Sequence, residues 1–128
     1  MAAATTARCV EAVQTARHAE DRGYPTILLA DDDDELRCAL VEAIRREGYL
    51  VLEAHDRASA LHAVQVHSRR IHMLLIDASL CDSAWAELLK QYRPDMRIVL
   101  LARHPQEMRP DAWLADSVVP KVREYFNA

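Results

Sequence analysis

Residues 26–34 read TILLADDDD, a short apolar run that ends in four consecutive aspartates, Asp31 to Asp34. An uncharged run of this length predicts a buried parallel strand, because such strands are covered on both faces. The carboxylates would then lie at the C-terminal edge of the sheet, where ligands bind in open α/β folds. Adjacent like charges repel one another, so each aspartate needs a cation, a helix N-terminus or open water nearby.

The rest of the chain alternates between helix and strand patterns. Apolar residues recur at helical spacing from Leu36 to Ile44, and Gly48 stands where a C-cap glycine is expected. Further strands are predicted at 49–54, 71–76, 97–101 and 117–119, with helices at 59–66 and 82–92 and a short segment interrupted by prolines at 105–114. This order predicts a doubly wound parallel sheet of five strands, because each connection is long enough for a right-handed crossover.

The size and composition of the chain predict one domain preceded by an extension. The chain has 128 residues, of which 51% are hydrophobic, enough for a single core. Residues 1–23 are rich in alanine and are predicted as an N-terminal helical extension that ends at Gly23. A frayed or disordered extension is the alternative for this segment. The predicted domain comprises residues 24–128.

Charge and hydropathy argue against several classes of function. The net charge is -4 and no basic tract is present, which argues against nucleic-acid binding within this chain and against binding to an anionic membrane. No apolar run has the length of a membrane span, and the first residues lack the basic start and apolar middle of a signal peptide. These patterns predict a cytoplasmic protein.

Side chains with useful chemistry follow three of the predicted strands. Asp31 and Asp32 end the first strand, Asp77 ends the third, and Lys121 follows the last. Carboxylate oxygens are the ligands that Mg²⁺ prefers, and a carboxylate beside the cation can attack a phosphoryl group. For Asp33 and Asp34 a role in capping the next helix is the favoured interpretation, because a helix N-terminus stabilises acidic side chains.

These residues resemble the site of response regulator receiver domains, the phosphoacceptor domains of two-component signalling. The match covers roughly three quarters of the chain, from Thr26 to about Val122. It rests on Leu29-Ala30-Asp31-Asp32-Asp33 with Glu35-Leu36-Arg37, on Leu75-Ile76-Asp77, on Glu87-Leu88-Leu89, on Pro94-Asp95, and on Ala115-Asp116 through Pro120-Lys121. Each piece alone is weak, but the set and its order are specific.

The resemblance implies a flavodoxin-like fold and a phosphorelay function. Asp77 would accept a phosphoryl group from a phosphohistidine of a histidine kinase or a histidine phosphotransfer protein. Mg²⁺ would be bound by Asp31, Asp32, Asp77 and the backbone carbonyl of Ser79, and Lys121 would contact the phosphoryl oxygens. Such a domain is not an enzyme beyond catalysing its own phosphorylation and dephosphorylation.

Several positions depart from the pattern of the family. Ala102 stands where the family carries a Thr or Ser that hydrogen-bonds the phosphoryl group, and Val118 replaces an aromatic residue in the last strand. In the loop after Asp77, Trp85 occupies the place of a glycine and must change that loop or cover it. These departures imply an altered output switch in an atypical member.

The end of the chain also departs from the family. Only Val122 to Ala128 follow Lys121, so the last helix is predicted to be shortened or missing. Two hypotheses follow: the chain continues into a further domain, or the N-terminal helix covers the sheet in its place, from the same chain or from a partner in a homodimer. A second function also remains open, that of a pseudo-receiver acting as a phosphorylation-independent protein-binding or dimerisation module.

Overall fold

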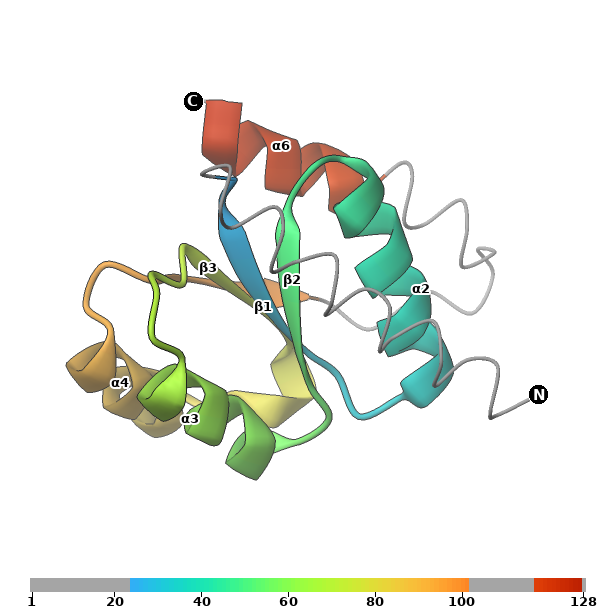
Figure 1. The fold of residues 1–128 in the computed structure, drawn as a ribbon. Helices are drawn as coiled ribbons and strands as arrows, with labels where there is room; N and C mark the ends of the chain where they lie inside the picture. Colours follow the sequence, from blue (N-terminus) through green and yellow to red (C-terminus); the bar gives the residue numbers. More distant parts are fainter. Residues whose placement is uncertain (1–23, 102–116, 128) are drawn as a thin grey trace.

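The computed structural model describes residues 24–101 and 117–127. Strands and helices alternate along the first of these ranges, as Figure 1 shows. In chain order the elements are β1 (Thr26–Ala30), α2 (Asp34–Arg46), β2 (Leu50–Ala54), α3 (Arg57–Val66), β3 (Met73–Asp77), the 3₁₀ turn η1 (Ala78–Leu80), α4 (Ser83–Tyr92), β4 (Arg97–Leu101) and α6 (Val119–Asn127).

The strands form one parallel sheet in the order β2-β1-β3-β4. The first strand of the chain is central, with Leu28 paired to Leu52 of β2 and to Leu74 of β3. A central strand is covered on both faces, which explains why all five residues of β1 are buried and why all but Thr26 are apolar. The predicted doubly wound α/β fold is therefore confirmed.

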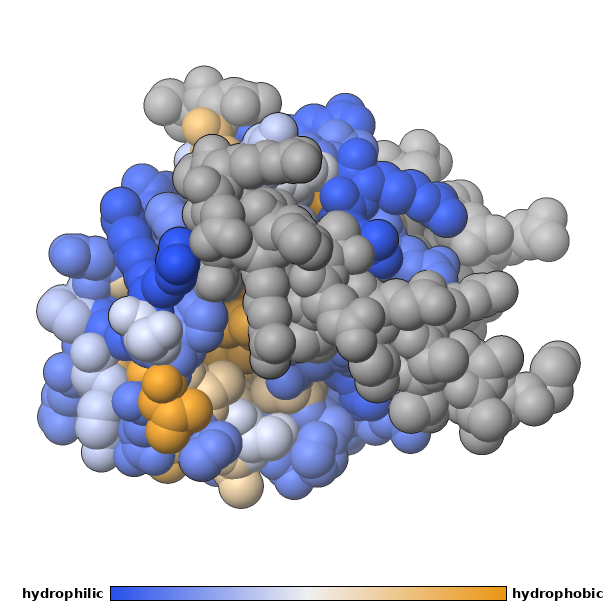
Figure 2. All heavy atoms as spheres, in the orientation of Figure 1, coloured by the Kyte–Doolittle hydropathy of each residue, from blue (hydrophilic) through white to orange (hydrophobic). Residues whose placement is uncertain are grey.

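Two hydrophobic layers lie on opposite faces of the sheet, because successive strand residues point to opposite sides. Ile27 and Leu29 face α2 and α6, and Leu28 and Ala30 face α3 and α4. Figure 1 shows the two pairs of helices on opposite sides of the strands. The outer surface over α3 and α4 is mostly hydrophilic in Figure 2, as expected of helices that bury one face. No helix that the structure describes has the length and apolarity needed to cross a membrane.

Aspartates start three of the helices. The side chain of Asp33 accepts a hydrogen bond from the Leu36 N–H at 3.1 Å and so caps α2, as predicted. Asp56 and Asp82 cap α3 and α4 in the same way. At the other end of α2, Gly48 adopts a φ of 95°, a conformation that favours glycine, which confirms the predicted helix end.

The predicted last strand at 117–119 is wrong, because these residues are helical and lead into α6. Val118, Val122 and Phe126 recur every four residues, and all three pack against the layer formed with α2. This helical spacing outweighs the strand propensity of two adjacent valines. Pro120 lies in the first turn, where its missing N–H is tolerated. Within the described residues the sheet therefore has four strands, and five are not found.

Helix α6 is nine residues long and packs toward the edge of the sheet where the strands begin. Its Arg123 pairs with Glu47 just before β2, and its Phe126 ring lies 5.0 Å from that of Tyr49. The guanidinium of Arg97, the first residue of β4, lies 5.3 Å from the Tyr125 ring. Figure 1 shows α6 at this end, away from the turn that leads into α2. The predictions for residues 1–23, for Ala102 and for the segment 105–114 lie outside the described residues.

Candidate metal centre

The structure brings three of the predicted site residues together at the C-terminal edge of the sheet. Each of Asp31, Asp32 and Asp77 offers a carboxylate oxygen, and these oxygens lie within 4.8 Å of one another. Their proximity follows from the register of two neighbouring parallel strands, in which Ala30 pairs with Ile76. The residues that follow these two must then lie side by side.

Asp31 is the buried member of the cluster, with 2% of its surface exposed. Its Oδ1 accepts a hydrogen bond from the Asp33 N–H at 2.9 Å. Burial, with smaller contributions from the charges of Asp77 and Asp32, raises the pKa of Asp31 to about 6, against the lowering effect of that hydrogen bond. A bound cation would have the opposite effect on this carboxyl group. A set of clustered, partly desolvated carboxylates therefore fits a hard divalent cation with oxygen ligands.

Asp77 ends β3 and shapes the turn that follows it. Its Oδ1 accepts a hydrogen bond from the Ser79 N–H at 3.0 Å, which caps the turn η1. The Asp77 side chain is half-buried, whereas Ser79 is exposed. One oxygen of the Asp77 carboxylate is thus held by the following turn, while the side chain stays partly exposed to solvent.

Arg37 anchors the acidic turn after β1, a role that our sequence analysis missed. Its Nη1 donates to the backbone carbonyl of Asp31 at 2.9 Å, while its Nε faces Glu53 of β2 at 3.3 Å. Its Nη2 donates to Asp34 at 2.6 Å. The position of an arginine one turn into the helix after the aspartates is a signal that could have identified it.

The loop after Asp77 is held by Arg57, which the sequence analysis also missed. Arg57 Nε donates to the Leu80 carbonyl at 2.7 Å, and Nη2 donates to Asp82 at 2.8 Å. Its guanidinium lies 5.7 Å from the centroid of the Trp85 ring. Trp85 itself is buried among the residues that pack between the sheet and α3 and α4. The indole therefore turns into the core, with Arg57 over it.

Lys121, predicted beside Asp77, forms no salt bridge with Asp31, Asp32 or Asp77 within the described residues. It lies in the first turn of α6, its side chain is exposed, and it makes no salt bridge among the residues that the structure describes. The neighbouring Arg123 pairs with Glu47 toward the opposite edge of the sheet. Val118, predicted to stand in the last strand as an altered switch position, is instead a buried helical residue.

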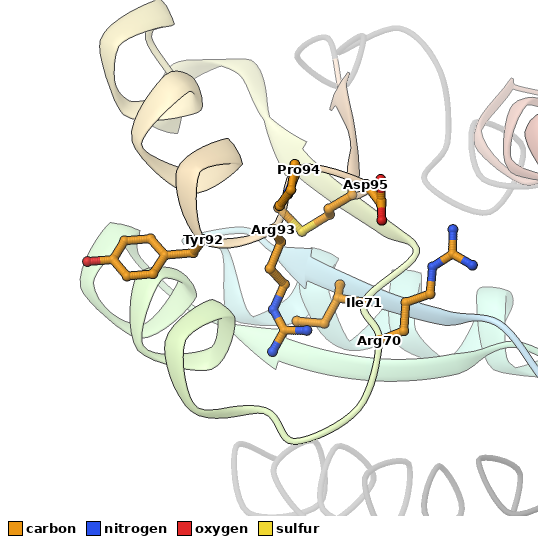
Figure 3. A pocket seen from close by; sticks show the side chains of 7 residues that line it. Arg70, Ile71, Tyr92, Arg93, Pro94 and Asp95 are labelled. Carbon is orange, nitrogen blue, oxygen red and sulfur yellow. The ribbon is translucent and has the colours of Figure 1, made fainter.

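A shallow hollow of about 160 Å³ lies away from the cluster of Asp31, Asp32 and Asp77, at the edge where β3 and β4 begin. It is lined by Arg70, Ile71 and the residues from Tyr92 to Met96, most of which Figure 3 labels. The guanidinium of Arg93 donates to the backbone carbonyls of Val64, His67 and Arg69. Arg93 therefore closes the C-terminal end of α3, and its contacts are those of a structural residue.

Comparison with known proteins finds a similarity to a sensor kinase. No family model matches it. The sensor kinase CckA of Brucella abortus (strain 2308) is 25% identical over 88 residues, which are 66% of this chain and 9% of the kinase. The chain thus spans about a tenth of the length of this curated relative.

Solved structures with the same arrangement of elements are receiver domains and response regulators. The CheY-like receiver domain protein of Methanospirillum hungatei JF-1 superposes with a TM-score of 0.64 at 18% identity, covering 81% of this chain and 94% of that one. A response regulator of Burkholderia pseudomallei, solved with a phosphorylated aspartic acid and a calcium ion, gives a TM-score of 0.53 at 19% identity, covering 79% and 72%. This chain has the fold of a response regulator receiver domain.

Proposed function

We propose that this domain accepts a phosphoryl group on Asp77 as part of a two-component phosphorelay. The observation that carries the proposal is the cluster of Asp31, Asp32 and Asp77, whose carboxylate oxygens lie within 4.8 Å of one another at the C-terminal edge of the sheet. The acceptor is Asp77 because it is half-buried and ends a central strand, where the following turn holds its Oδ1.

In the proposed reaction an oxygen of Asp77 attacks the phosphorus of a phosphohistidine. The new P–O bond forms as the P–N bond breaks, and the imidazole leaves with the electron pair. Mg²⁺ would be held by Asp31, Asp32, Asp77 and the carbonyl of Ser79, and when bound it neutralises charge on the phosphoryl oxygens. The Burkholderia pseudomallei regulator, which contains both a phosphorylated aspartic acid and a calcium ion, supports this ligand class on the same fold.

The similarity to CckA supports a histidine kinase or a histidine phosphotransfer protein as the phosphodonor. The proposed domain catalyses nothing beyond its own phosphorylation and dephosphorylation, and the cytoplasm is its proposed location. Homodimer formation and an altered output switch belong to the same proposal. The resemblance assigns Lys121 to the phosphoryl oxygens, and this assignment requires the exposed Lys121 side chain to reach them from α6.

The test is chemical phosphorylation of the full chain by acetyl phosphate in the presence of Mg²⁺. Intact-protein mass spectrometry should show the addition of one phosphoryl group to the wild type and none to Asp77→Asn. Asp95→Asn, which removes an exposed carboxylate at the other edge of the sheet, is the matched control and should be modified like the wild type. An unmodified wild type would exclude the phosphoacceptor function.

A pseudo-receiver that binds partners without phosphorylation is the second candidate, and the position of Lys121 favours it. The exposed Lys121 makes no salt bridge among residues 24–101 and 117–127, so no ammonium group pairs with Asp77. In this case self-association measured by sedimentation should be the same for the wild type and for Asp77→Ala, with or without acetyl phosphate. A dimer that forms only after phosphorylation would exclude this candidate.

A further inference from the structure

Arg37 connects the acidic turn to two neighbouring elements. Its side chain is only 13% exposed, and the three contacts of its guanidinium reach the carbonyl of Asp31, the carboxylate of Glu53 and the carboxylate of Asp34. These groups belong to the turn after β1, to β2 and to the first turn of α2. A planar guanidinium can serve several acceptors in fixed directions, which a lysine ammonium on a flexible stem does not match.

The contacts of Arg37 complete the anchoring of Asp31. The Asp31 N–H donates to the Ala54 carbonyl at 3.1 Å, and its carboxylate accepts the Asp33 N–H at 2.9 Å. Arg37 fixes the remaining backbone polar group, the Asp31 carbonyl. Because that carbonyl belongs to the peptide unit shared with Asp32, its orientation sets where the exposed Asp32 side chain begins.

The charge of Arg37 is directed away from the cluster. Two carboxylates, Glu53 and Asp34, face its guanidinium, and within the described residues it makes no salt bridge to Asp31, Asp32 or Asp77. An arginine that turned toward the three aspartates would neutralise them and exclude a cation. Glu53 and Asp34 therefore hold the guanidinium where it contacts the Asp31 carbonyl and forms no salt bridge with the three clustered carboxylates.

We infer that Arg37 is a positioning residue for the metal site: it orients the Asp31–Asp32 peptide for cation binding, while Glu53 keeps its charge off the carboxylates. This inference rests on the proposed function, in which those carboxylates bind Mg²⁺. Groups that orient metal ligands without touching the metal change its affinity by about 10- to 100-fold when removed. The magnitude makes the role measurable.

The test is Mn²⁺ binding to the full chain, measured by electron paramagnetic resonance of the free ion. Arg37→Gln should weaken binding by about tenfold. Loss of a positive charge near a cation site would by itself strengthen binding, so a weaker affinity isolates the positioning role. Arg46→Gln removes the same charge from the exposed last turn of α2 and is the matched control, with affinity equal to or slightly above that of the wild type.

Arg37→Lys keeps the charge and is the second variant. Its affinity should fall between those of the wild type and Arg37→Gln, because an ammonium does not reproduce the three contacts. Affinity in either folded variant equal to or above that of the wild type overturns the inference and leaves the metal site in place. A wild type that binds no Mn²⁺ overturns the metal site and this inference together, whereas phosphorylation of Asp77 is read separately by mass.

Discussion

The guanidinium of Arg57, the first residue of α3, lies 5.7 Å from the centroid of the Trp85 ring in α4. The same group donates to the Leu80 carbonyl and to Asp82, so it links two helices to the loop that follows Asp77. This loop begins at the proposed phosphoacceptor. Its conformation therefore depends on a residue that lies twenty positions earlier in the chain.

Arg57→Ala should reduce the free energy of unfolding by about 1 kcal/mol, because a cation–π contact and hydrogen bonds at a partly exposed site are lost. Urea denaturation of the metal-free protein is the measurement. Lys90→Ala, which removes an exposed positive charge from the last turn of α4, should change the midpoint much less. Equal effects of the two substitutions would show that the Arg57 contacts contribute nothing specific.

Asp31→Asn should stabilise the metal-free protein at neutral pH. Burial raises the native pKa of Asp31 to about 6, so the native state holds this proton more tightly than the unfolded chain. Ionised Asp31 therefore lowers stability above about pH 6, and this cost disappears as the pH falls toward the unfolded value of 3.8. The free energy of unfolding of the variant should exceed that of the wild type by on the order of 2 kcal/mol at pH 7.5 and by much less at pH 4.5.

Thermal or urea unfolding at the two pH values measures this difference. Saturating Mg²⁺ should stabilise the wild type and leave Asp31→Asn nearly unchanged, because the cation favours the carboxylate form. A difference between the two proteins that stays constant with pH would contradict the assignment of the raised pKa to Asp31.

Asp32→Ala should abolish Mg²⁺ binding, and Asp34→Ala should leave it nearly unchanged. Asp32 offers an oxygen to the cluster, whereas Asp34 is the first residue of α2 and contacts Arg37. Because Glu53 and the Asp31 carbonyl still hold Arg37 in Asp34→Ala, the turn should keep its shape. Titration calorimetry with Mg²⁺ compares the two variants. Equal losses of Mg²⁺ affinity would contradict the assignment of Asp32 to the metal site and of Asp34 to the start of α2.

His72 should make the stability of the protein depend on pH below about 6.5. Its Nδ1 accepts a hydrogen bond from the Thr26 N–H at 3.0 Å, which requires a neutral ring nitrogen. Burial, followed by the charge of Arg70, lowers the pKa of His72. As the pH falls, the unfolded chain is therefore protonated at His72 before the folded protein is. The contribution of His72 to stability is present above its unfolded pKa of about 6.5 and is lost as the pH falls below it.

The measurement compares urea unfolding of the wild type and of His72→Gln at pH 7.5 and at pH 5.5. The wild type should be more stable by about 1 kcal/mol at the higher pH, with a smaller margin at the lower one. His62→Gln, which changes an exposed histidine of α3, is the matched control and should change the free energy of unfolding much less. A margin for His72→Gln that does not vary with pH would contradict the lowered pKa of His72, because the ring would then take up its proton equally in the folded and the unfolded chain.

Much of the fold was predictable because it depends on local patterns. Buried parallel strands have apolar runs such as Ile27 to Ala30, and caps such as Asp33 and Gly48 act within a few residues. The segment at 117–119 was predicted wrongly, because two adjacent valines favour a strand while the spacing of Val118, Val122 and Phe126 favours a helix. Packing against the α2 face selects the helix, and local propensity does not reveal that choice.

By itself the sequence determined that this is a parallel α/β domain with Asp31, Asp32 and Asp77 at one edge, because all parallel strands end on the same side. Only the tertiary structure decided which charged side chains hold the turns around these aspartates. Arg37 and Arg57 reach across elements to hold the turns of the site, and Lys121 lies in α6, whose Arg123 and Phe126 contact residues at the other edge. Long side chains choose partners by position in space, and spacing along the chain does not encode that choice.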